Sequence, residues 1–421
     1  MRHRLDFPFL MTNPPTPPLA GRALRAVACG GAIMGLALGI RHVQGLFLLP
    51  MTMERGWSRE TFGLAIALQN LCWGLAQPVA GMIADRFGSL RVVAAGTLLY
   101  LAGLVAMSQA TGTAGLLLGA GVMIGCAQSC TTFGVIYAAI SRIADPAQRS
   151  RALGIAGALG GLGQFAMVPL AQGLQQWLGW AGALVALGLG IAVLLPAARG
   201  LDDAGAGAAD LVAPREQSLR EALREAFAQR GFWLLNAGFL ACGFQLAFIA
   251  SHLPAWLLDL GLRPRDAVVG LALVALANTV GTYLFGLWGG LHSRKRLLAG
   301  LYLARSGAMA LFLLAPPSAL AVDLFCAAMG FLWLGTVPLT SGIVSGVFGL
   351  RHVGTLFGFV FVGHQLGGFL GVWLGGLVYD RTHSYQPVWL IAMGLGVVAA
   401  ALHLLIDERP LATRLPARVP A

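Results

Sequence analysis

Hydrophobic runs of about 17 to 27 residues recur along the whole chain, separated by polar connections. Each run is long enough to cross a bilayer, and it must do so as a helix because backbone polar groups in hydrocarbon need partners within the segment. Hydrophobic residues fill 57% of the 421 positions and charged residues only 11%, against about 25% in soluble domains. The sequence therefore predicts an all-α integral membrane protein. It excludes a secreted enzyme, a nucleic-acid binder and a disordered scaffold.

We expect twelve spans in two sets of six. The first set covers residues 26–50, 62–83, 92–108, 114–140, 152–174 and 181–198, and the second covers 232–258, 267–291, 297–314, 319–344, 356–379 and 388–406. This divides the chain into a disordered N-terminus (1–25), a six-helix bundle (26–198), a linker (199–231), a second six-helix bundle (232–406) and a tail (407–421). In the linker, Ser218 and Glu221 predict a capping box that starts a short amphipathic helix.

The basic residues predict how the chain is oriented. Of the 28 lysines and arginines, 21 lie in the N-terminus, the even-numbered connections or the C-terminus, 5 in odd-numbered connections and 2 within spans. The positive-inside rule then places both termini and the linker in the cytoplasm. With a single lysine, Lys295, the arginine bias is typical of a GC-rich bacterial genome, so we expect a protein of the bacterial inner membrane. All six cysteines lie within apolar runs without metal-type spacing, so we expect neither a metal site nor a disulfide.

The two halves resemble each other in the same orientation. A Leu-Pro pair followed by a glycine and an arginine occurs at residues 49–59 and again at residues 253–263. Parallel repeats of this kind place a substrate site between the halves, near the middle of the membrane.

Residues 81–91, between the second and third spans, read GMIADRFGSLR. This segment resembles the signature loop of the major facilitator superfamily, and the twelve-span pattern agrees with that family. The resemblance implies two pseudo-symmetric bundles, alternating access to a central site, and no cofactor. It also implies a cytoplasmic gate at Gly81, Asp85, Arg86, Gly88 and Arg91. The basic pair that the family usually carries after Gly88 is replaced by Ser89 and Leu90.

Three further stretches are similar to bacterial members of the monocarboxylate and oxalate–formate transporter group. They are RHVQGLF at residues 41–47, WSR at 57–59 and FVGHQLG at 361–367. The resemblance implies a secondary transporter of small organic anions, above all monocarboxylates. Monocarboxylate transporters usually carry an arginine in span eight, whereas residues 267–291 contain none.

Arg41, in span one, is a charge that needs an explanation. A charge at the bilayer centre costs about 2.5 to 3.5 kcal/mol on insertion scales. Gln44 shares its face of the helix, while Gly31, Gly35 and Gly39 form a separate ridge suited to tight helix packing. Arg41 either binds an anionic substrate directly or is a structural arginine bonded to neighbouring helices.

The acidic residues are informative by their position. All 17 lie in loops, termini or span ends, and Asp323 is the deepest. Exporters of lipophilic cations typically need a buried carboxylate, and drug–proton antiporters typically carry a Gly-Pro pair in span five, which residues 152–174 lack. A buried arginine without buried acids makes a positive cavity, which favours anions. For Arg305, in span nine, we expect interhelical packing or snorkelling toward the headgroups.

Proton coupling would need a residue other than a carboxylate. His364, in span eleven, either adds a positive charge or shuttles a proton, or it is a neutral histidine bonded between helices. His42 points away from Arg41 and fits a structural role. Other midspan polar residues are candidate substrate contacts, each with an interhelical hydrogen bond as the alternative: Gln128, Tyr137, Gln245, Asn278, Trp333, Thr336 and Gln365.

The leading hypothesis is a monomeric secondary transporter that moves a small organic anion across the bilayer, with a proton in the case of symport. A major facilitator exporter of drugs or metabolites is the alternative, and a transport-like sensor is a third. An enzyme is not expected, because the sequence has no glycine-rich phosphate loop, no zinc-type His pair and no Gly-x-Ser-x-Gly elbow.

Overall fold

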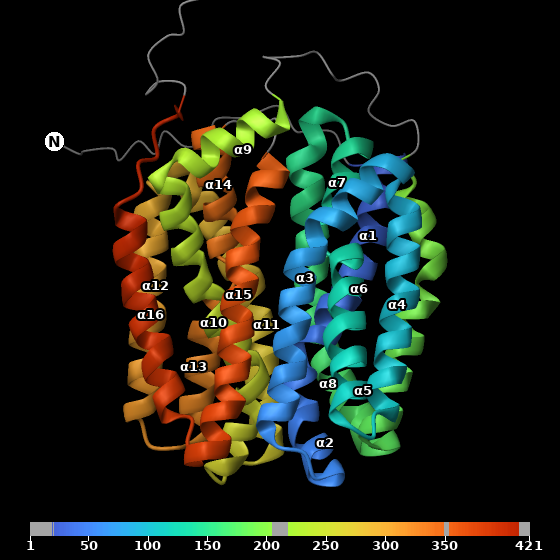
Figure 1. The fold of residues 1–421 in the computed structure, drawn as a ribbon, viewed down its shortest axis with the longest axis vertical. Coiled ribbons are helices and arrows are strands. Elements are labelled where there is room, and N and C mark those ends of the chain that lie inside the picture. Colours follow the sequence, from blue (N-terminus) through green and yellow to red (C-terminus); the bar gives the residue numbers. More distant parts are fainter. Residues whose placement is uncertain (1–18, 20, 204–217, 349–352, 412–421) are drawn as a thin grey trace, which may run out of the picture.

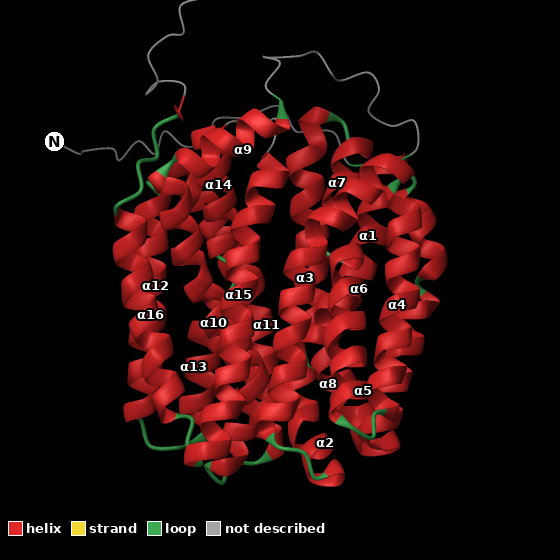
Figure 2. Ribbon diagram, in the orientation of Figure 1, coloured by secondary structure: helices red, strands yellow, loops and turns green. Residues whose placement is uncertain are grey.

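The computed structural model describes residues 19, 21–203, 218–348 and 353–411. Within these ranges every regular element is a helix, and the long helices run roughly parallel to one another (Figures 1 and 2). Of the N-terminus that we expected to be disordered, residues 1–18 and 20 lie outside the described residues, as do the middle of the linker and most of the tail. Residues 21–25 are helical, because α1 already begins at Gly21.

The helices before the linker include several short pieces. They are α1 (Gly21–His42), η1 (Gln44–Phe47), α2 (Leu48–Arg55), α3 (Arg59–Phe87), α4 (Ser89–Gln109), α5 (Thr113–Leu116), η2 (Leu117–Met123), α6 (Ile124–Thr131), α7 (Phe133–Ile143), α8 (Pro146–Val193) and η3 (Leu195–Leu201). Those after it are α9 (Leu219–Ala228), α10 (Arg230–Asp259), α11 (Pro264–Leu291), α12 (Arg294–Leu314), α13 (Ala319–Phe331), α14 (Thr336–Phe348), α15 (Val353–Thr382) and α16 (Gln386–Leu404).

The predicted spans coincide with these helices. Ten helical stretches of the described chain are long and apolar enough to cross a membrane. One of them, 152–201, covers two predicted spans, because Gly179 leaves the helical region with φ 70° and turns the chain. The 29-residue helix α3 covers the predicted second span. An all-α membrane fold is thereby confirmed.

Three of the spans are interrupted near their middle. Span one stops at His42 and continues as η1 and α2, span four breaks at Thr132, and span ten breaks between Phe331 and Thr336. Irregular backbone at membrane depth is tolerated only where it is buried in protein or lines a cavity. The breaks therefore point to the middle of the bundle as the place where function resides.

The segments before and after the linker meet along two helix pairs. Helix α3 packs along α15, and α8 packs along α11 (Figure 1). We call the end of the bundle that carries α9 and the start of α1 the linker end, and the end that carries α2 the far end. In Figure 1 the linker end is at the top.

The repeated Leu-Pro-Gly-Arg motif has the same backbone geometry in both halves. Gly56 follows α2 with φ 65°, and Gly261 follows α10 with φ 79°. Both glycines adopt the left-handed conformation that side chains disfavour, and each ends a helix at the far end. The next long helices, α3 and α11, then begin within a few residues.

Helix α9 begins with a capping box. The Ser218 hydroxyl accepts from the Glu221 backbone N–H (3.3 Å), and the Glu221 carboxylate accepts from the Ser218 N–H (2.9 Å). Its Phe227 ring packs edge-on against Phe359 of α15, which ties the helix to the second half.

The glycine ridge of α1 packs directly against α8. A Cβ on Gly35 would lie 2.8 Å from the Leu159 carbonyl oxygen, and one on Gly39 would lie 2.7 Å from that of Gly163. The two backbones therefore touch, and the opposite face of α1, with Arg41, is left for the interior of the bundle.

We predict that Gly35→Ala destabilises the protein. Alanine is normally the better helix former by about 0.5 to 1 kcal/mol, but here its methyl group would overlap a backbone carbonyl, with a typical overpacking cost of about 1 to 3 kcal/mol. The matched control is Gly154→Ala on α8, where an added Cβ meets nothing within 4 Å. Thermal unfolding in detergent should show a lower melting temperature for the first variant only; equal values would contradict the tight packing.

Candidate functional site

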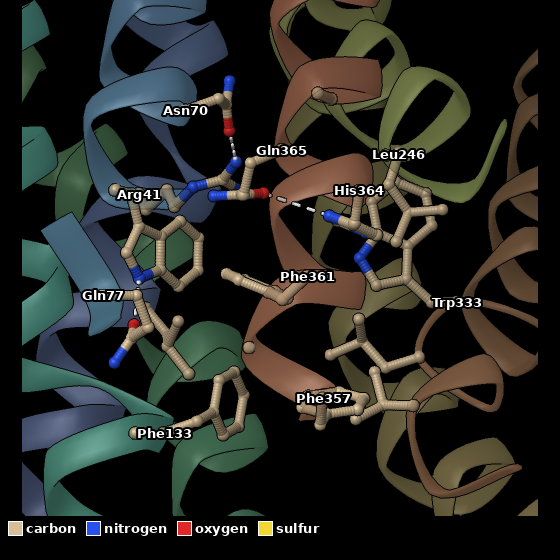
Figure 3. Close-up of a pocket in the computed structure, with 18 of the residues that line it drawn as sticks. Arg41, Asn70, Gln77, Phe133, Leu246, Trp333, Phe357, Phe361, His364 and Gln365 are labelled. Atoms are coloured by element: carbon tan, nitrogen blue, oxygen red, sulfur yellow. Dashed lines mark hydrogen bonds between the residues drawn. The ribbon is translucent and has the colours of Figure 1, made fainter. Parts of the chain in front are cut away.

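A cavity of about 450 Å³ lies between the two halves of the chain. Its walls come from α1, α3, α7 and α8 on one side, and from α10, α14, α15 and the break before α14 on the other (Figure 3). Most of the lining is carbon. Among the described lining residues, Arg41 is the one with a permanent charge.

Arg41 enters this cavity from the last turn of α1. The helix stops one residue later, so the negative end of its dipole lies beside the guanidinium and stabilises it. Arg41 Nη2 donates to Oδ1 of Asn70, and the guanidinium lies 5.1 Å from the Trp73 ring centroid. Its Nε is buried without a partner, and Arg41 forms no ion pair within the described chain. The positive charge is therefore not neutralised by any ion pair within the residues that the structure describes.

The wall that faces Arg41 is formed by His364 and Gln365 of α15. The His364 Nδ1–H donates to Oε1 of Gln365 over 3.0 Å. This bond turns the Gln365 amide so that its Nε2 points toward Arg41, and that donor is buried without a partner (Figure 3). Two hydrogen-bond donors thus face each other from opposite halves with no acceptor between them.

An aromatic wall adjoins these polar groups. Trp73 of α3 meets Phe361 of α15 edge to face, with centroids 5.3 Å apart, and Trp73 Nε1 donates to Gln77 Oε1 (3.1 Å). Phe361 in turn stacks on the His364 ring at 5.4 Å. Because the indole N–H already has a partner, the Trp73 ring offers a ligand an apolar surface and no free hydrogen-bond donor.

Five of the predicted substrate contacts line the cavity: Arg41, Tyr137, Trp333, His364 and Gln365. The other five lie outside the lining. Gln128 donates to Gln69 and Tyr100, and Gln245 donates to the Ala392 carbonyl. Asn278 accepts from the Leu334 N–H, and Thr336 contacts Cys242. Gln44 is buried with both amide atoms unpaired. For the first four, the interhelical hydrogen bond is the better interpretation, and we leave all five out of the proposed site.

Several lining residues were not singled out from the sequence. They are Asn70, Trp73 and Gln77 on α3, Gln164 on α8 and Ser341 on α14. The three on α3 follow the spacing of three and four residues that marks one helical face. That spacing is a signal in the sequence, although it says nothing about which face meets a cavity. His42 also lines the cavity, but its Nε2 is bonded to the Leu271 carbonyl (3.0 Å), as a structural role requires.

Arg305 is fully buried and binds the break in span ten. Its Nε and Nη2 donate to the Leu332 carbonyl (3.1 and 2.6 Å), and Nη2 also donates to the Trp333 carbonyl. Its Nη1 donates to Gln245 Oε1 (3.3 Å). Of the two expectations for Arg305, interhelical packing is therefore the one observed, and its effect is to hold the backbone that carries Trp333 into the cavity.

The predicted gate residues lie at the linker end. Gly88 joins α3 to α4 with φ 89°, Arg86 and Arg91 are exposed, and the Asp85 side chain lies outside the described residues. Ser89, which stands where the family has a basic residue, bonds Asp203 instead: its N–H and hydroxyl donate to the carboxylate over 3.0 and 2.8 Å. Arg142 completes this cluster with a 2.7 Å ion pair to Asp203.

A clasp closes the far end between the two halves. Arg59, at the start of α3, donates with Nη1 and Nη2 to the Asp259 carboxylate of α10 (2.7 and 2.8 Å) and lies 3.8 Å from the Tyr379 ring centroid. Its Nη1 also donates to the Tyr385 hydroxyl, and Asp380 accepts from the first N–H groups of α3. We call Arg59, Asp259, Asp380, Tyr379 and Tyr385 the far-end clasp. From the sequence, Arg59 is expected in the connection before the second span, as part of the WSR stretch and without a role in joining the two halves.

The helices are long enough to cross a membrane, and their two halves enclose a cavity and are cross-linked at one end. This arrangement is typical of polytopic transport proteins. The chain matches the Major Facilitator Superfamily over residues 27–371, and it belongs to that family of transporters. This agrees with the resemblance of residues 81–91 to the signature loop.

Individual relatives are distant but span nearly the whole chain. The uncharacterized MFS-type transporter YcxA of Bacillus subtilis is 24% identical over 384 residues, 86% of this chain and 90% of that protein. Monocarboxylate transporter 13 of Rattus norvegicus is 27% identical over 411 residues, 93% of this chain and 92% of that protein. A solved bacterial homologue of the human lysosomal transporter Spinster, inward-facing and occupied, matches the fold with a TM-score of 0.74 at 16% identity, covering 95% of this chain and 100% of that one.

The Asp203 cluster makes stability depend on pH. Burial alone would raise the pKa of Asp203, but the hydrogen bonds from Ser89 and the Arg142 guanidinium hold that pKa below its usual value. The stabilisation is then present above the unfolded-state pKa and is lost as pH falls through the folded-state pKa. We expect the melting-temperature difference between the chain and Asp203→Asn to be constant from about pH 7 to about pH 5 and to shrink toward about pH 3.

Weakening the far-end clasp should let the far end open more often. We predict that Asp259→Asn increases this opening about fivefold, as expected for a partly exposed ion pair worth about 1 kcal/mol. The reporter is a cysteine placed in the cavity wall by Ala250→Cys. Its rate of labelling by an impermeant maleimide is measured from the far-end side of sealed vesicles, after subtraction of the labelling of the native cysteines. Asp323→Asn is the control, and unchanged labelling of the Asp259 variant would show that the clasp does not restrain opening.

Proposed function

We propose that this protein is a secondary transporter of small organic anions, with monocarboxylates as its substrate class, working by alternating access. The observation that carries the proposal is the Arg41 guanidinium, which reaches the cavity without an acidic partner among the described residues. Arg41 Nε and Gln365 Nε2 are both buried without partners, and the Arg41 charge has no acidic partner within the described chain. Buried donors without acceptors are costly, and a carboxylate between them would satisfy both.

The cost of Arg41 supports the same interpretation. An unpaired cation at membrane depth is retained where a ligand or a water-filled cavity compensates it. A monocarboxylate supplies one negative charge and two acceptor oxygens, which matches one guanidinium and one amide donor. The whole-length similarity to a protein called monocarboxylate transporter 13 adds support of a weaker kind.

The orientation in the membrane follows from charge. The linker end carries the basic N-terminus, the linker and the even-numbered connections, so we infer that it faces the cytoplasm of a bacterial cell across the inner membrane. The far-end clasp then closes the periplasmic side. The cavity extends from Arg41 to Phe133 and Phe357, toward the cytoplasmic side.

Alternating access needs the two six-helix bundles, 26–198 and 232–406, to rock as units around the cavity. In the state seen here Arg59 joins the bundles at the far end. Opening toward the periplasm requires that clasp to break and a cytoplasmic closure to form, for which residues 81–91 are the proposed gate. One chain encloses the cavity, so a monomer is sufficient.

His364 is the proposed proton-coupling residue. It lines the cavity and donates to Gln365. Proton uptake by His364 would add a second positive charge beside Arg41 and strengthen anion binding, which is the coupling that symport requires.

An exporter of drugs or metabolites is the alternative, and the cavity argues against such an exporter where its cargo is a lipophilic cation. No aspartate or glutamate is found among the described lining residues, so a cation entering there would meet Arg41 without any counter-charge. The cost of placing two cations in a cavity of low dielectric opposes such a substrate.

We predict that monocarboxylates raise the melting temperature of the purified protein and that Arg41→Gln abolishes the effect. A hydrogen bond to a charged group contributes about 1.5 to 3 kcal/mol, so the substitution should weaken binding about 10- to 100-fold. Arg41→Lys keeps the charge without the planar fork and should lose less.

The matched control is Arg25→Gln, which removes an exposed arginine at the linker end of the same helix. It should bind acids as the unmodified chain does. The proposal would be contradicted if acids stabilised Arg41→Gln as strongly as the control. It would also be contradicted if lipophilic cations stabilised the protein and acids did not.

A further inference from the structure

The two ends of the cavity differ in chemistry. Arg41, Asn70, His364 and Gln365 gather at one end, which we call the polar end (Figure 3). Beyond Phe361 the cavity continues between Phe133 of α7 and Phe357 of α15, which face one another from the two halves (Figure 3). A ligand anchored by a carboxylate at the polar end must therefore place the rest of its body against aromatic rings.

The cavity is large for a short acid. Its volume of about 450 Å³ would hold about fifteen water molecules at about 30 Å³ each. Acetate or lactate would leave most of that space to water in contact with carbon. Filling such a space with an apolar body is favourable, and cavities of this size are typical of ligands with a substantial apolar part.

The aromatic rings of the cavity form a continuous row that starts beside the Arg41 guanidinium. Trp73 lies beside Arg41, Phe361 meets Trp73 at 5.3 Å, and Phe357 follows Phe361 at 6.4 Å between centroids. Gln365, Phe361 and Phe357 are spaced four residues apart and so share one face of α15. From Gln365 to Phe357 the helix rises about 12 Å, which is room for a ring joined to a carboxylate by a short spacer.

The charge count restricts the anion to one carboxylate. Arg41 is the one permanent cation among the described lining residues, and the aromatic end offers no second one. A dianion would have to place its second carboxylate either against the rings, where nothing would compensate the lost hydration, or beside the first, where both would share one permanent cation.

We propose that the substrates are aryl-substituted monocarboxylates, with the carboxylate between Arg41 and Gln365 and the ring against Trp73 and Phe361. This rests on the proposed anion-transport function and narrows it to one chemical class. The ring and the carboxylate meet different side chains, so ligands that carry only one of the two groups test them apart.

The test compares binding of matched ligands to the purified full-length protein by competition and thermal stabilisation. The panel is phenylacetate, cyclohexylacetate, acetate, phenylmalonate and phenethylamine. We expect phenylacetate to bind about 10- to 100-fold tighter than acetate because its ring is buried, and about 2- to 10-fold tighter than cyclohexylacetate because its ring is aromatic. Phenylmalonate and phenethylamine should bind more weakly than phenylacetate.

Two variants locate the ring. Phe361→Leu should weaken phenylacetate binding about 3- to 10-fold more than it weakens acetate binding, because Phe361 also stacks on His364 at the polar end. Phe369→Leu, eight residues along the same helix and outside the cavity lining, should change neither.

The outcomes separate this inference from the proposed function. If acids bind but acetate or cyclohexylacetate binds as tightly as phenylacetate, or if Phe361→Leu has no effect, the aryl inference is overturned while anion transport stands. If no acid binds and phenethylamine does, both are overturned.

Discussion

The uncompensated charge of Arg41 is the constraint on which the rest of the cavity depends. Left alone at membrane depth it would cost about 2.5 to 3.5 kcal/mol or more. The fold offsets this with the C-terminal end of α1, which stops at His42, with the Asn70 carbonyl group and with the Trp73 ring. None of these carries a negative charge, so the site remains positive. A mobile anion is then the natural counter-charge, and its exchange is compatible with transport.

Arg305 shows what a structural arginine looks like in the same chain. Like Arg41, Arg305 has no acidic partner in the described chain. It is fully buried, and it donates to a backbone carbonyl that follows the end of α13 within span ten. Its Nε, Nη1 and Nη2 all have acceptors within the protein. Arg41 differs in that Nε has none and in that its side chain reaches the cavity. The distinction between the two is therefore one of unused donors.

The sequence predicts the spans and the superfamily well, because run length, charge bias and residues 81–91 are local signals. It does not predict the breaks at Thr132 and after Phe331, since tertiary donors such as Arg305 hold the second of these. The candidate site is half predictable. Arg41 and His364 stand out as costly residues. Neutral residues such as Gln245 and Trp73 could not be assigned to interhelical bonds or to the cavity, because the sequence does not distinguish a helix face that meets a cavity from one that packs on another helix.

The most direct test of the central claim is a structure of the protein with a bound bromine-labelled arylacetate, with the bromine located by anomalous scattering. We expect the carboxylate within hydrogen-bond distance of both Arg41 and Gln365, and the bromine beyond Phe361 toward Phe357. A ligand bound away from Arg41, with the guanidinium still held by Asn70 and Trp73 alone, would contradict it.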